Sequence, residues 1–331
     1  MDRLEKLRVA VIGAGNMGKN HLRNYSVLPD VELVALADVS PTTKALAEEY
    51  NIKHFTDYKA MLDTCRIDAV SIVVPTPLHA EVATEVMNRG IHVLLEKPIA
   101  STVAEADALI KLANSKKIVF TVGHIEHYNP LLGAIKQVID ENQIGKVTSV
   151  ICKRVGVFPG REPKTDVIID LAVHDIGIIS MLLGRQPKHI SSHGSRTHHS
   201  KEIDSAEILM DYGDSSGFIQ ANWITPVKIR TIAVTGSEGY IEGDYVTQEL
   251  ELYQHTIKKT PSQDFSGFVM EMKTQQRQNI KVDFAEPLAK ELKSFIGRIQ
   301  GGKVEIVSPE EARDALRFAL QAANVKKEDI E

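Results

Sequence analysis

The chain of 331 residues has only two cysteines, Cys65 and Cys152, which are too few for a disulfide framework or a cysteine-based metal site. It has no apolar run long enough to span a bilayer, and residues 1–6 lack the apolar segment of a signal peptide. It also has no block of basic residues, and its formal net charge is -5. These absences argue against a membrane or nucleic acid as a partner. We therefore expect a cytoplasmic protein.

What is present is an ordinary globular composition, with 43% apolar and 25% charged residues. The length allows two domains with sizeable cores. A small anionic substrate would need a locally basic pocket, which the net charge does not exclude.

A glycine-rich turn follows the first expected strand, Arg8–Ile12, and leads into a helix that runs to about Tyr25. The turn reads Gly13-Ala14-Gly15-Asn16-Met17-Gly18. Glycines between a strand and a helix let backbone N–H groups approach a pyrophosphate, and the helix N-terminus favours its charge. The motif alone is weak, because an ordinary tight turn has the same composition. Its position between a strand and a helix favours a dinucleotide site.

Asp38 follows the second expected strand, Val31–Ala37, about 20 residues after the glycines. A carboxylate at this point accepts hydrogen bonds from an adenosine ribose and repels a 2′-phosphate. We therefore expect NAD as the cofactor in preference to NADP. The alternative role for Asp38 is a helix cap or turn residue, which Ser40-Pro41 would also suit.

Strands and helices continue to alternate up to residue 125, which predicts a doubly wound parallel sheet. The expected strands are 54–55, 69–74, 91–95 and 119–122, and the expected helices are 42–50, 58–64, 103–115 and one that ends near residue 89. Thr76, Pro77 and His79 follow one of these strands, so they fall at the same sheet edge as Gly13. His79 is equally well explained as a helix-start residue with its hydrogen bonds satisfied.

Lys97 follows the strand 91–95 in the sequence Glu96-Lys97-Pro98. The proline disfavours a helical conformation for the lysine, which is therefore expected to lie extended just past the strand's carboxyl end. Ligands bind at that end of an open α/β sheet. A lysine there can exchange a proton with a substrate hydroxyl. A solvated lysine at a strand end is the alternative.

The second half changes to longer, alternating strands, which predict an α+β domain with a large, mostly antiparallel open sheet. The expected strands are 147–154, 188–195, 206–212, 216–223, 230–235, 239–243 and 249–253, with closing helices near 286–298 and 309–323. The expected domains are residues 1–125 for NAD binding and 126–331 for substrate binding and oligomerisation. Helices would cover one sheet face, which leaves the other for a second subunit.

Asp170 and His174 open a strongly apolar helix and are four residues apart, so they share one helix face. An acid and an imidazole in this arrangement can order one another and a substrate hydroxyl, and the imidazole can carry the proton. A helix cap followed by a core histidine is the alternative.

Four features in this order and spacing resemble the Gfo/Idh/MocA oxidoreductase family over essentially the whole chain: Gly13-x-Gly15-x-x-Gly18, Asp38, Glu96-Lys97-Pro98 and Asp170-x-x-x-His174. The resemblance implies a Rossmann domain joined to an α/β domain whose open sheet mediates a homodimer or homotetramer. It also implies a sugar or cyclitol substrate and three catalytic residues, Lys97, Asp170 and His174. In that set Lys97 exchanges a proton near the reacting hydroxyl, His174 is the expected general base, and Asp170 orients the base or the substrate.

The resemblance also assigns binding residues and no metal. The implied cofactor residues are Gly13, Gly15, Asn16, Met17, Gly18, Asp38, Thr76, Pro77, His79, Glu96 and Lys97. The implied substrate residues are Lys97, His124, Tyr128, Arg154, Arg161, Asp170 and His174. The family commonly has an arginine–aromatic pair after Gly123, where this chain has His127-Tyr128, so an anionic contact from that loop is not expected.

A finer resemblance extends from Lys153 to Arg161 and on through Asp170–Asp175. This segment is similar to a subgroup of the family that oxidises the 3-hydroxyl of UDP-N-acetylglucosamine. Arg154 and Arg161 would then hold the diphosphate, because guanidinium groups fit phosphate oxygens. Solvated charge on a strand and a loop is the alternative for both arginines.

Other functions are compatible with parts of this pattern. A free sugar or an inositol would need the same catalytic groups, as would an NAD-dependent glycoside hydrolase that passes through a 3-keto sugar. A dinucleotide sensor would need no proton carrier, so Lys97, Asp170 and His174 argue against it. A zinc site at His193, His198 and His199 is not expected, because no cysteine or carboxylate lies at a familiar ligand spacing.

Overall fold

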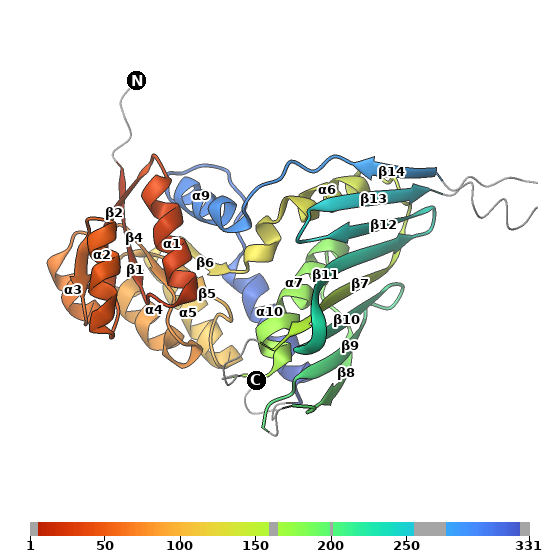
Figure 1. Cartoon of the computed structure of the whole chain (residues 1–331), viewed down its shortest axis with the longest axis horizontal. Coiled ribbons are helices and arrows are strands. Elements are labelled where there is room, and N and C mark those ends of the chain that lie inside the picture. Colours follow the sequence, from red (N-terminus) through yellow and green to blue (C-terminus); the bar gives the residue numbers. More distant parts are fainter. Residues whose placement is uncertain (1–5, 159–164, 199–200, 255–275, 325–331) are drawn as a thin grey trace, which may run out of the picture. The chain divides into compact units, whose positions relative to one another are not determined.

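The computed structural model describes residues 6–158, 165–198, 201–254 and 276–324. Within these ranges the chain forms two compact units. The first consists of residues 6–128 and 286–320, and the second of the described residues between 129 and 285 together with 321–324. Figure 1 labels their elements along the chain.

The first unit is built from βα repeats followed by two late helices. Its strands are β1 (Leu7–Ile12), β2 (Val31–Ala37), β3 (Lys53–Phe55), β4 (Ala69–Ile72), β5 (His92–Glu96) and β6 (Phe120–Gly123). Its helices are α1 (Asn16–Val27), η1 (Pro41–Thr43), α2 (Lys44–Glu49), α3 (Tyr58–Thr64), η2 (Thr76–Leu78), α4 (His79–Asn88), α5 (Val103–Lys116), η3 (Ile125–Tyr128), α9 (Pro287–Ile299) and most of α10 (Pro309–Ala322).

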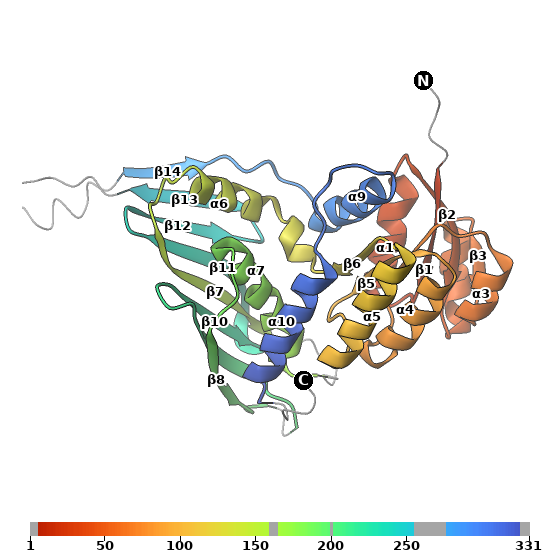
Figure 2. The same cartoon turned by 180° about the vertical axis from the view of Figure 1, so that it is seen from behind.

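The six strands form one parallel sheet in the order β3-β2-β1-β4-β5-β6, which confirms the expected Rossmann arrangement. From β1 the chain proceeds to β2 and β3 toward one edge of the sheet, and from β4 it proceeds to β5 and β6 toward the other edge. Right-handed crossovers then place α1 and α5 on opposite faces, as Figures 1 and 2 show. The central strands β4 and β5 are buried along almost their whole length because both faces are covered.

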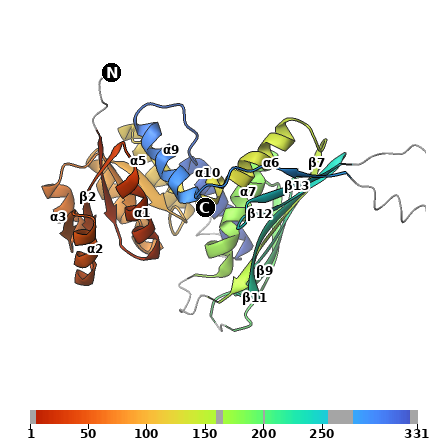
Figure 3. The ribbon, with the colours of Figure 1, turned by 45° about the horizontal axis from the view of Figure 1, so that its top comes forward.

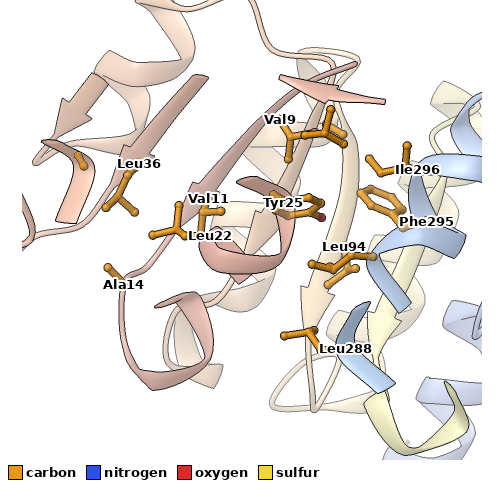
Figure 4. Close-up of a cluster of buried hydrophobic side chains, with 14 residues drawn as sticks. Val9, Val11, Ala14, Leu22, Tyr25, Leu36, Leu94, Leu288, Phe295 and Ile296 are labelled. Carbon is orange, nitrogen blue, oxygen red and sulfur yellow. The ribbon is translucent and has the colours of Figure 1, made fainter. Parts of the chain in front are cut away.

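Helix α9 packs against the sheet face that α1 covers, although it follows the whole second unit in sequence. Its side chains Leu288, Phe295 and Ile296 are buried beside Tyr25 and Leu94 (Figure 4). The division therefore differs from the expected one at 125/126. Residues 286–320 belong with the nucleotide-binding sheet because the apolar face of α9 completes its core.

The second unit contains one large sheet with helices on one face. Its strands are β7 (Val147–Val157), β8 (His189–Ser195), β9 (Ser205–Asp211), β10 (Ser216–Asn222), β11 (Ile224–Gly236), β12 (Gly239–Asp244), β13 (Glu249–Gln254) and β14 (Gln276–Ile280). Its helices are α6 (Pro130–Asp140), η4 (Ile168–Ala172) and α7 (Val173–Leu183).

The order of this sheet is β14-β13-β12-β11-β7-β10-β9-β8, and every neighbouring pair is antiparallel except β7 with β10. Figure 3 shows α6 and α7 on one side of it. The strands alternate accordingly, as Val150 and Cys152 of β7 are buried and Ile151 between them is exposed. The sheet is therefore open on one face within the described residues. Nor does any helix of the described ranges have the length and apolarity to cross a membrane.

Candidate active site

The glycine-rich turn between β1 and α1 is closed so tightly that two positions admit only glycine. Gly13 has φ +97°, and a Cβ there would overlap the carbonyl oxygen of Val73. A Cβ on Gly18 would overlap the carbonyl oxygen of Gly13. A Cβ on Gly15 would meet nothing within 4 Å, and Gly15 and Asn16 are exposed at the N-terminus of α1. The turn therefore presents an open backbone to a phosphate group.

Asp38 lies at the carboxyl end of β2, and its carboxylate contacts this turn. Oδ2 accepts the N–H of Ala14 at 2.6 Å, and Oδ1 accepts the N–H of Ser40 at 2.8 Å. These contacts show Asp38 as a turn residue that also bonds to the glycine motif, and its role in binding a ribose stays a prediction.

The ends of β4 and β5 lie side by side in the sheet and carry the other predicted cofactor residues. Lys97 is half-buried directly after β5, and the Lys97–Pro98 peptide bond is cis. Thr76 and Pro77 form the short helix η2 after β4. They are half-buried and exposed, respectively.

His79 is buried, with Nδ1 2.8 Å from the carbonyl oxygen of Pro98 and Nε2 2.9 Å from that of Val74. Burial lowers the pKa of His79. The neutral ring therefore has one N–H to donate. This geometry matches the hydrogen-bonded helix-start residue, and it ties the loop after β4 to the loop that contains Lys97.

A network of buried polar side chains holds the carboxylate of Glu96 in place. Its Oε1 lies 3.2 Å from Nε2 of His21, and the other ring nitrogen of His21 lies 3.1 Å from Oγ of Ser71. The hydroxyl of Tyr25 lies 2.8 Å from the same Oγ. Oε2 of Glu96 accepts the N–H of Lys97 at 3.1 Å. The sequence analysis missed His21, although a histidine three residues after Gly18 on the buried face of α1 was a usable signal.

His124 follows β6 and lies close enough to Lys97 to be affected by its charge. Burial lowers the pKa of His124 to about 3, with smaller contributions from His127 and the Lys97 cation. Its imidazole is therefore neutral at physiological pH. Burial also lowers the pKa of His127, which Glu311 and Glu126 oppose.

Tyr128, the last residue of this stretch of the first unit, directs its hydroxyl to another segment of the same unit. The hydroxyl accepts the N–H of Val307 at 3.1 Å, and burial raises the pKa of Tyr128. Thr121 donates to the carbonyl oxygen of the same Val307 at 2.8 Å. These bonds hold η3 and the segment before α10 together.

Glu291 of α9 is a buried acid that sequence reasoning did not identify. Its exposed fraction is 0%, and neither carboxyl oxygen has a hydrogen-bond partner among the described residues. Burial raises the pKa of Glu291 well above its usual range, and the charge of Glu96 adds to the shift. Burial therefore favours the protonated form of Glu291, whereas its neighbour Glu96 accepts hydrogen bonds.

In the second unit, Asp170 and His174 lie at the junction of two helix types. Residues Ile168–Ala172 form a turn of π-helix, and α7 begins at Val173. Asp166 caps this segment, because its Oδ1 accepts the N–H groups of Ile168 and Ile169 at 3.0 Å each. The helical segment therefore begins two residues before Asp170, which was expected to open it. π-turns occur frequently at functional sites.

His174 is buried, and Asp170 is partly exposed one turn before it. The two residues lie in consecutive turns of one helical segment, and their sharing of one helix face stays a prediction. The cofactor residues gather separately at the carboxyl edge of the first unit's sheet.

Arg154 differs from its predicted environment. Its side chain is 4% exposed, and its Nε and Nη2 donate to the two carboxylate oxygens of Asp175 at 2.9 and 2.8 Å. A guanidinium held in this way is poorly placed to bind a diphosphate, and it is not a solvated strand charge either. The second predicted diphosphate ligand, Arg161, lies outside the described residues.

No cluster of three or more His, Cys, Asp or Glu side chains that could hold a metal ion forms among the described residues. His199, the third histidine considered for zinc, lies outside them.

Comparison with known proteins gives two family matches that together cover more than half of the chain. Residues 7–124 match the profile described as "Oxidoreductase family, NAD-binding Rossmann fold". Residues 133–242 match the profile "GFO/IDH/MocA C-terminal domain". The first match spans the βα repeats of the first unit, and the second runs from α6 into β12 of the second unit.

Individual relatives agree with these matches. UDP-N-acetylglucosamine 3-dehydrogenase of Acidithiobacillus ferrooxidans is 27% identical over 95% of this chain and 96% of the relative. Its solved structure superposes with a TM-score of 0.85 at 25% identity, covering 99% of this chain and 100% of that one. scyllo-Inositol 2-dehydrogenase (NAD(+)) of Bacillus subtilis is 26% identical over 96% of this chain and 94% of the relative.

The residues of the first unit fit the cofactor that the family profile describes. The turn at Gly13–Gly18 is closed against its own backbone at Gly13 and Gly18 and open at Gly15, and Asp38 contacts it through the N–H of Ala14. The fold, the motif geometry and the two profile matches agree. The chain is thus a nicotinamide-dependent oxidoreductase that belongs to the Gfo/Idh/MocA family.

Proposed function

We propose that the protein is an NAD-dependent dehydrogenase that oxidises the 3-hydroxyl of UDP-N-acetylglucosamine or of a closely related nucleotide sugar. The observation that carries the proposal is Lys97, which follows β5 at the sheet edge where β1 leads into the glycine-rich turn, with β4 between the two strands. The choice of this substrate is supported by the full-length similarity to a UDP-N-acetylglucosamine 3-dehydrogenase, which is stronger than the similarity to the inositol dehydrogenase.

In this proposal the proton of the reacting hydroxyl is removed with the help of three residues, Lys97, Asp170 and His174. His174 is the general base, because a neutral imidazole accepts a proton near physiological pH. Asp170 orients the imidazole or a neighbouring sugar hydroxyl. Lys97 binds the reacting oxygen and stabilises the charge that builds up on it as the carbonyl forms.

The bound nicotinamide supplies the hydride acceptor, and the protein's part is to align it. Gly13, Gly15, Asn16, Met17 and Gly18 would hold the pyrophosphate. Asp38 would bind the adenosine ribose and disfavour a 2′-phosphate, so NAD is the proposed cofactor. Thr76, Pro77, His79 and Glu96 would line the nicotinamide end.

Three predicted substrate residues receive other roles. Arg154 holds Asp175, and the Tyr128 hydroxyl accepts the N–H of Val307, so neither is assigned to the sugar nucleotide. His124 is buried beside Lys97, so we assign it to the surroundings of the lysine rather than to direct substrate binding. The diphosphate would then depend on residues such as Arg161.

A free inositol or hexose is the second candidate substrate, because an inositol dehydrogenase is similar over nearly the same length. Such a substrate would use the same proton carriers. It would not need a diphosphate site.

The test is NADH formation, followed by absorbance, with NAD and a panel of UDP-sugars, free hexoses and inositols. We expect turnover with UDP-N-acetylglucosamine and little with NADP in place of NAD. Turnover confined to free polyols would overturn the nucleotide-sugar assignment and leave the dehydrogenase in place. Sugar hydrolysis without net NADH would instead indicate a glycosidase.

We also propose that the open face of the second unit's sheet joins subunits into a homodimer or homotetramer. Ile151, Phe218 and Leu209 are register neighbours on β7, β10 and β9, and their exposed fractions are 45%, 38% and 51%. Exposed apolar residues that adjoin in this way mark interaction surfaces. Light scattering should give an assembly, and Phe218→Lys should shift it toward monomer. An unchanged mass would contradict this interface.

A further inference from the structure

Arg154 and Asp175 form a buried, bidentate ion pair whose acidic member directly follows His174 in sequence. The two side chains are 4% and 1% exposed, and the nitrogen–oxygen distances are 2.9 and 2.8 Å. Arg154 is on β7, in the middle of the sheet, whereas Asp175 is in the first turn of α7. The pair therefore fixes the start of that helix to the sheet beneath it.

The surroundings of the pair hold the guanidinium in one orientation. Its central carbon lies 5.2 Å from the ring centroid of Tyr245, which is 5% exposed. Val150, Cys152 and Arg154 alternate along β7 and point to the helix-covered face, where all three are buried. A planar fork with two bonds to one carboxylate and an aromatic ring against it has little freedom to rotate.

We propose that the Arg154–Asp175 pair positions His174 and keeps its surroundings electrically balanced. The role of His174 as base rests on the proposed function. In this assignment neither Arg154 nor Asp175 touches the substrate. Both act through the catalytic histidine, and Arg154 is not a diphosphate ligand.

Charge gives the pair a second effect besides geometry. Arg154 is always cationic, so an imidazole next to it would resist protonation if Asp175 did not cancel that charge. The described charged or titratable groups around the pair and His174 are Asp170 on the same helical segment, Cys152 on β7, Arg230 opposite Arg154 on β11, and Tyr245. Of these, Asp170 is the remaining anion.

The decisive variant is Asp175→Asn, which keeps the shape of the side chain and removes only its charge. The histidine ring signals are followed by NMR during a pH titration, with the His174 signal assigned through His174→Gln. We expect the apparent pKa of His174 to fall by about one unit relative to the unaltered protein. The acidic limb of the kcat/KM profile should move by the same amount.

Two further variants separate position from charge. Arg154→Lys keeps the cation but loses the bidentate fork, so kcat should fall roughly tenfold or more with a smaller change in KM. In Arg154→Met with Asp175→Leu both charges are absent, and the apparent pKa of His174 should return to its original value. Asp68→Asn is the matched control, because Asp68 forms a bidentate pair with Arg8 in the first unit.

The His174 titration and the NADH assay distinguish a failure of the positioning role from a failure of the proposed function. A His174 titration that Asp175→Asn leaves unmoved, or that Asp68→Asn moves equally, would overturn the positioning role whatever the substrate is. If Asp175→Asn moves the titration but no sugar yields NADH with the unaltered protein, the positioning inference stands and the proposed function fails. If Asp175→Asn does not fold, the test is the double variant Arg154→Met with Asp175→Leu. An apparent pKa of His174 that differs between this folded variant and the unaltered protein would overturn the inference.

Discussion

Nε2 of His21 lies 3.2 Å from Oε1 of Glu96, and this contact joins the first helix to the strand that immediately precedes Lys97. Both residues are buried, and 75 positions separate them in sequence. The contact fixes the Glu96 carboxylate, which in turn accepts the N–H of Lys97. The backbone position of the proposed proton carrier thus depends on a histidine in the cofactor-binding helix.

His21→Ala should destabilise the protein by about 1–3 kcal/mol, because it leaves the buried carboxylate of Glu96 and the hydroxyl of Ser71 short of partners. Urea unfolding measures the loss. His54→Ala is the control, since His54 is only half-buried and its Nε2 lies 2.9 Å from the hydroxyl of Thr43. Equal losses for the two variants would contradict a special role for His21.

Glu291 should make the protein less stable as pH rises. Its folded pKa is raised by burial from the ordinary 4.5. Its contribution is therefore fully present below about pH 4.5 and is lost as pH climbs toward the folded pKa, at up to about 1.4 kcal/mol per pH unit. Glu291→Gln removes this dependence, so its advantage over the unaltered protein in urea unfolding should grow as pH rises above about 4.5.

Glu286, at the start of the same helix, provides the opposite control. Its pKa is lowered by its hydrogen bonds with Arg23. Its contribution is therefore present above about pH 4.5 and is lost as pH falls, and it is small because the pair is exposed. Glu286→Gln should not reproduce the alkaline gain of Glu291→Gln. A pH-independent difference for Glu291→Gln would show that Glu291 is ionised in the folded protein.

The glycine-rich turn predicts two separable defects. Gly18→Ala should destabilise the fold, because the new Cβ would overlap the carbonyl oxygen of Gly13. Gly15→Ala should leave the stability nearly unchanged, since its Cβ meets nothing within 4 Å, but should weaken NAD binding by obstructing the pyrophosphate. Thermal unfolding and NADH fluorescence titration distinguish them. Intact NAD affinity in Gly15→Ala would contradict the proposed cofactor position.

Lys97→Ala should lower kcat by roughly 10²–10⁴-fold, the usual range for the loss of a proton-transfer group. NADH binding, measured by fluorescence, should remain within a few-fold of the original because the proposed pyrophosphate and adenosine contacts belong to other residues. Lys111→Ala, an exposed substitution on α5, is the matched control. Turnover that survives Lys97→Ala would rule out the lysine as a proton carrier.

Much of the first unit followed from local signals in the sequence. The strand at Val31–Ala37 and the helix at Tyr58–Thr64 occur with their expected bounds. The glycine-rich turn stands between a strand and a helix as its composition required. Such features are predictable because the hydrophobic period, glycine and proline determine the conformation of residues only a few positions away in sequence. The strand at Gln276–Ile280 and the π-turn at Ile168–Ala172 were missed, since neither has a distinct local pattern.

The sequence by itself determined which chemical groups the protein has and the order of the strands and helices that carry them. Only the tertiary structure decided their partners. It paired Arg154 with Asp175, His21 with Glu96, and α9 with the nucleotide-binding sheet. The physical reason is that a buried charge or an apolar helix face must find a complement in space. That complement can come from any part of the chain, so no local pattern specifies it.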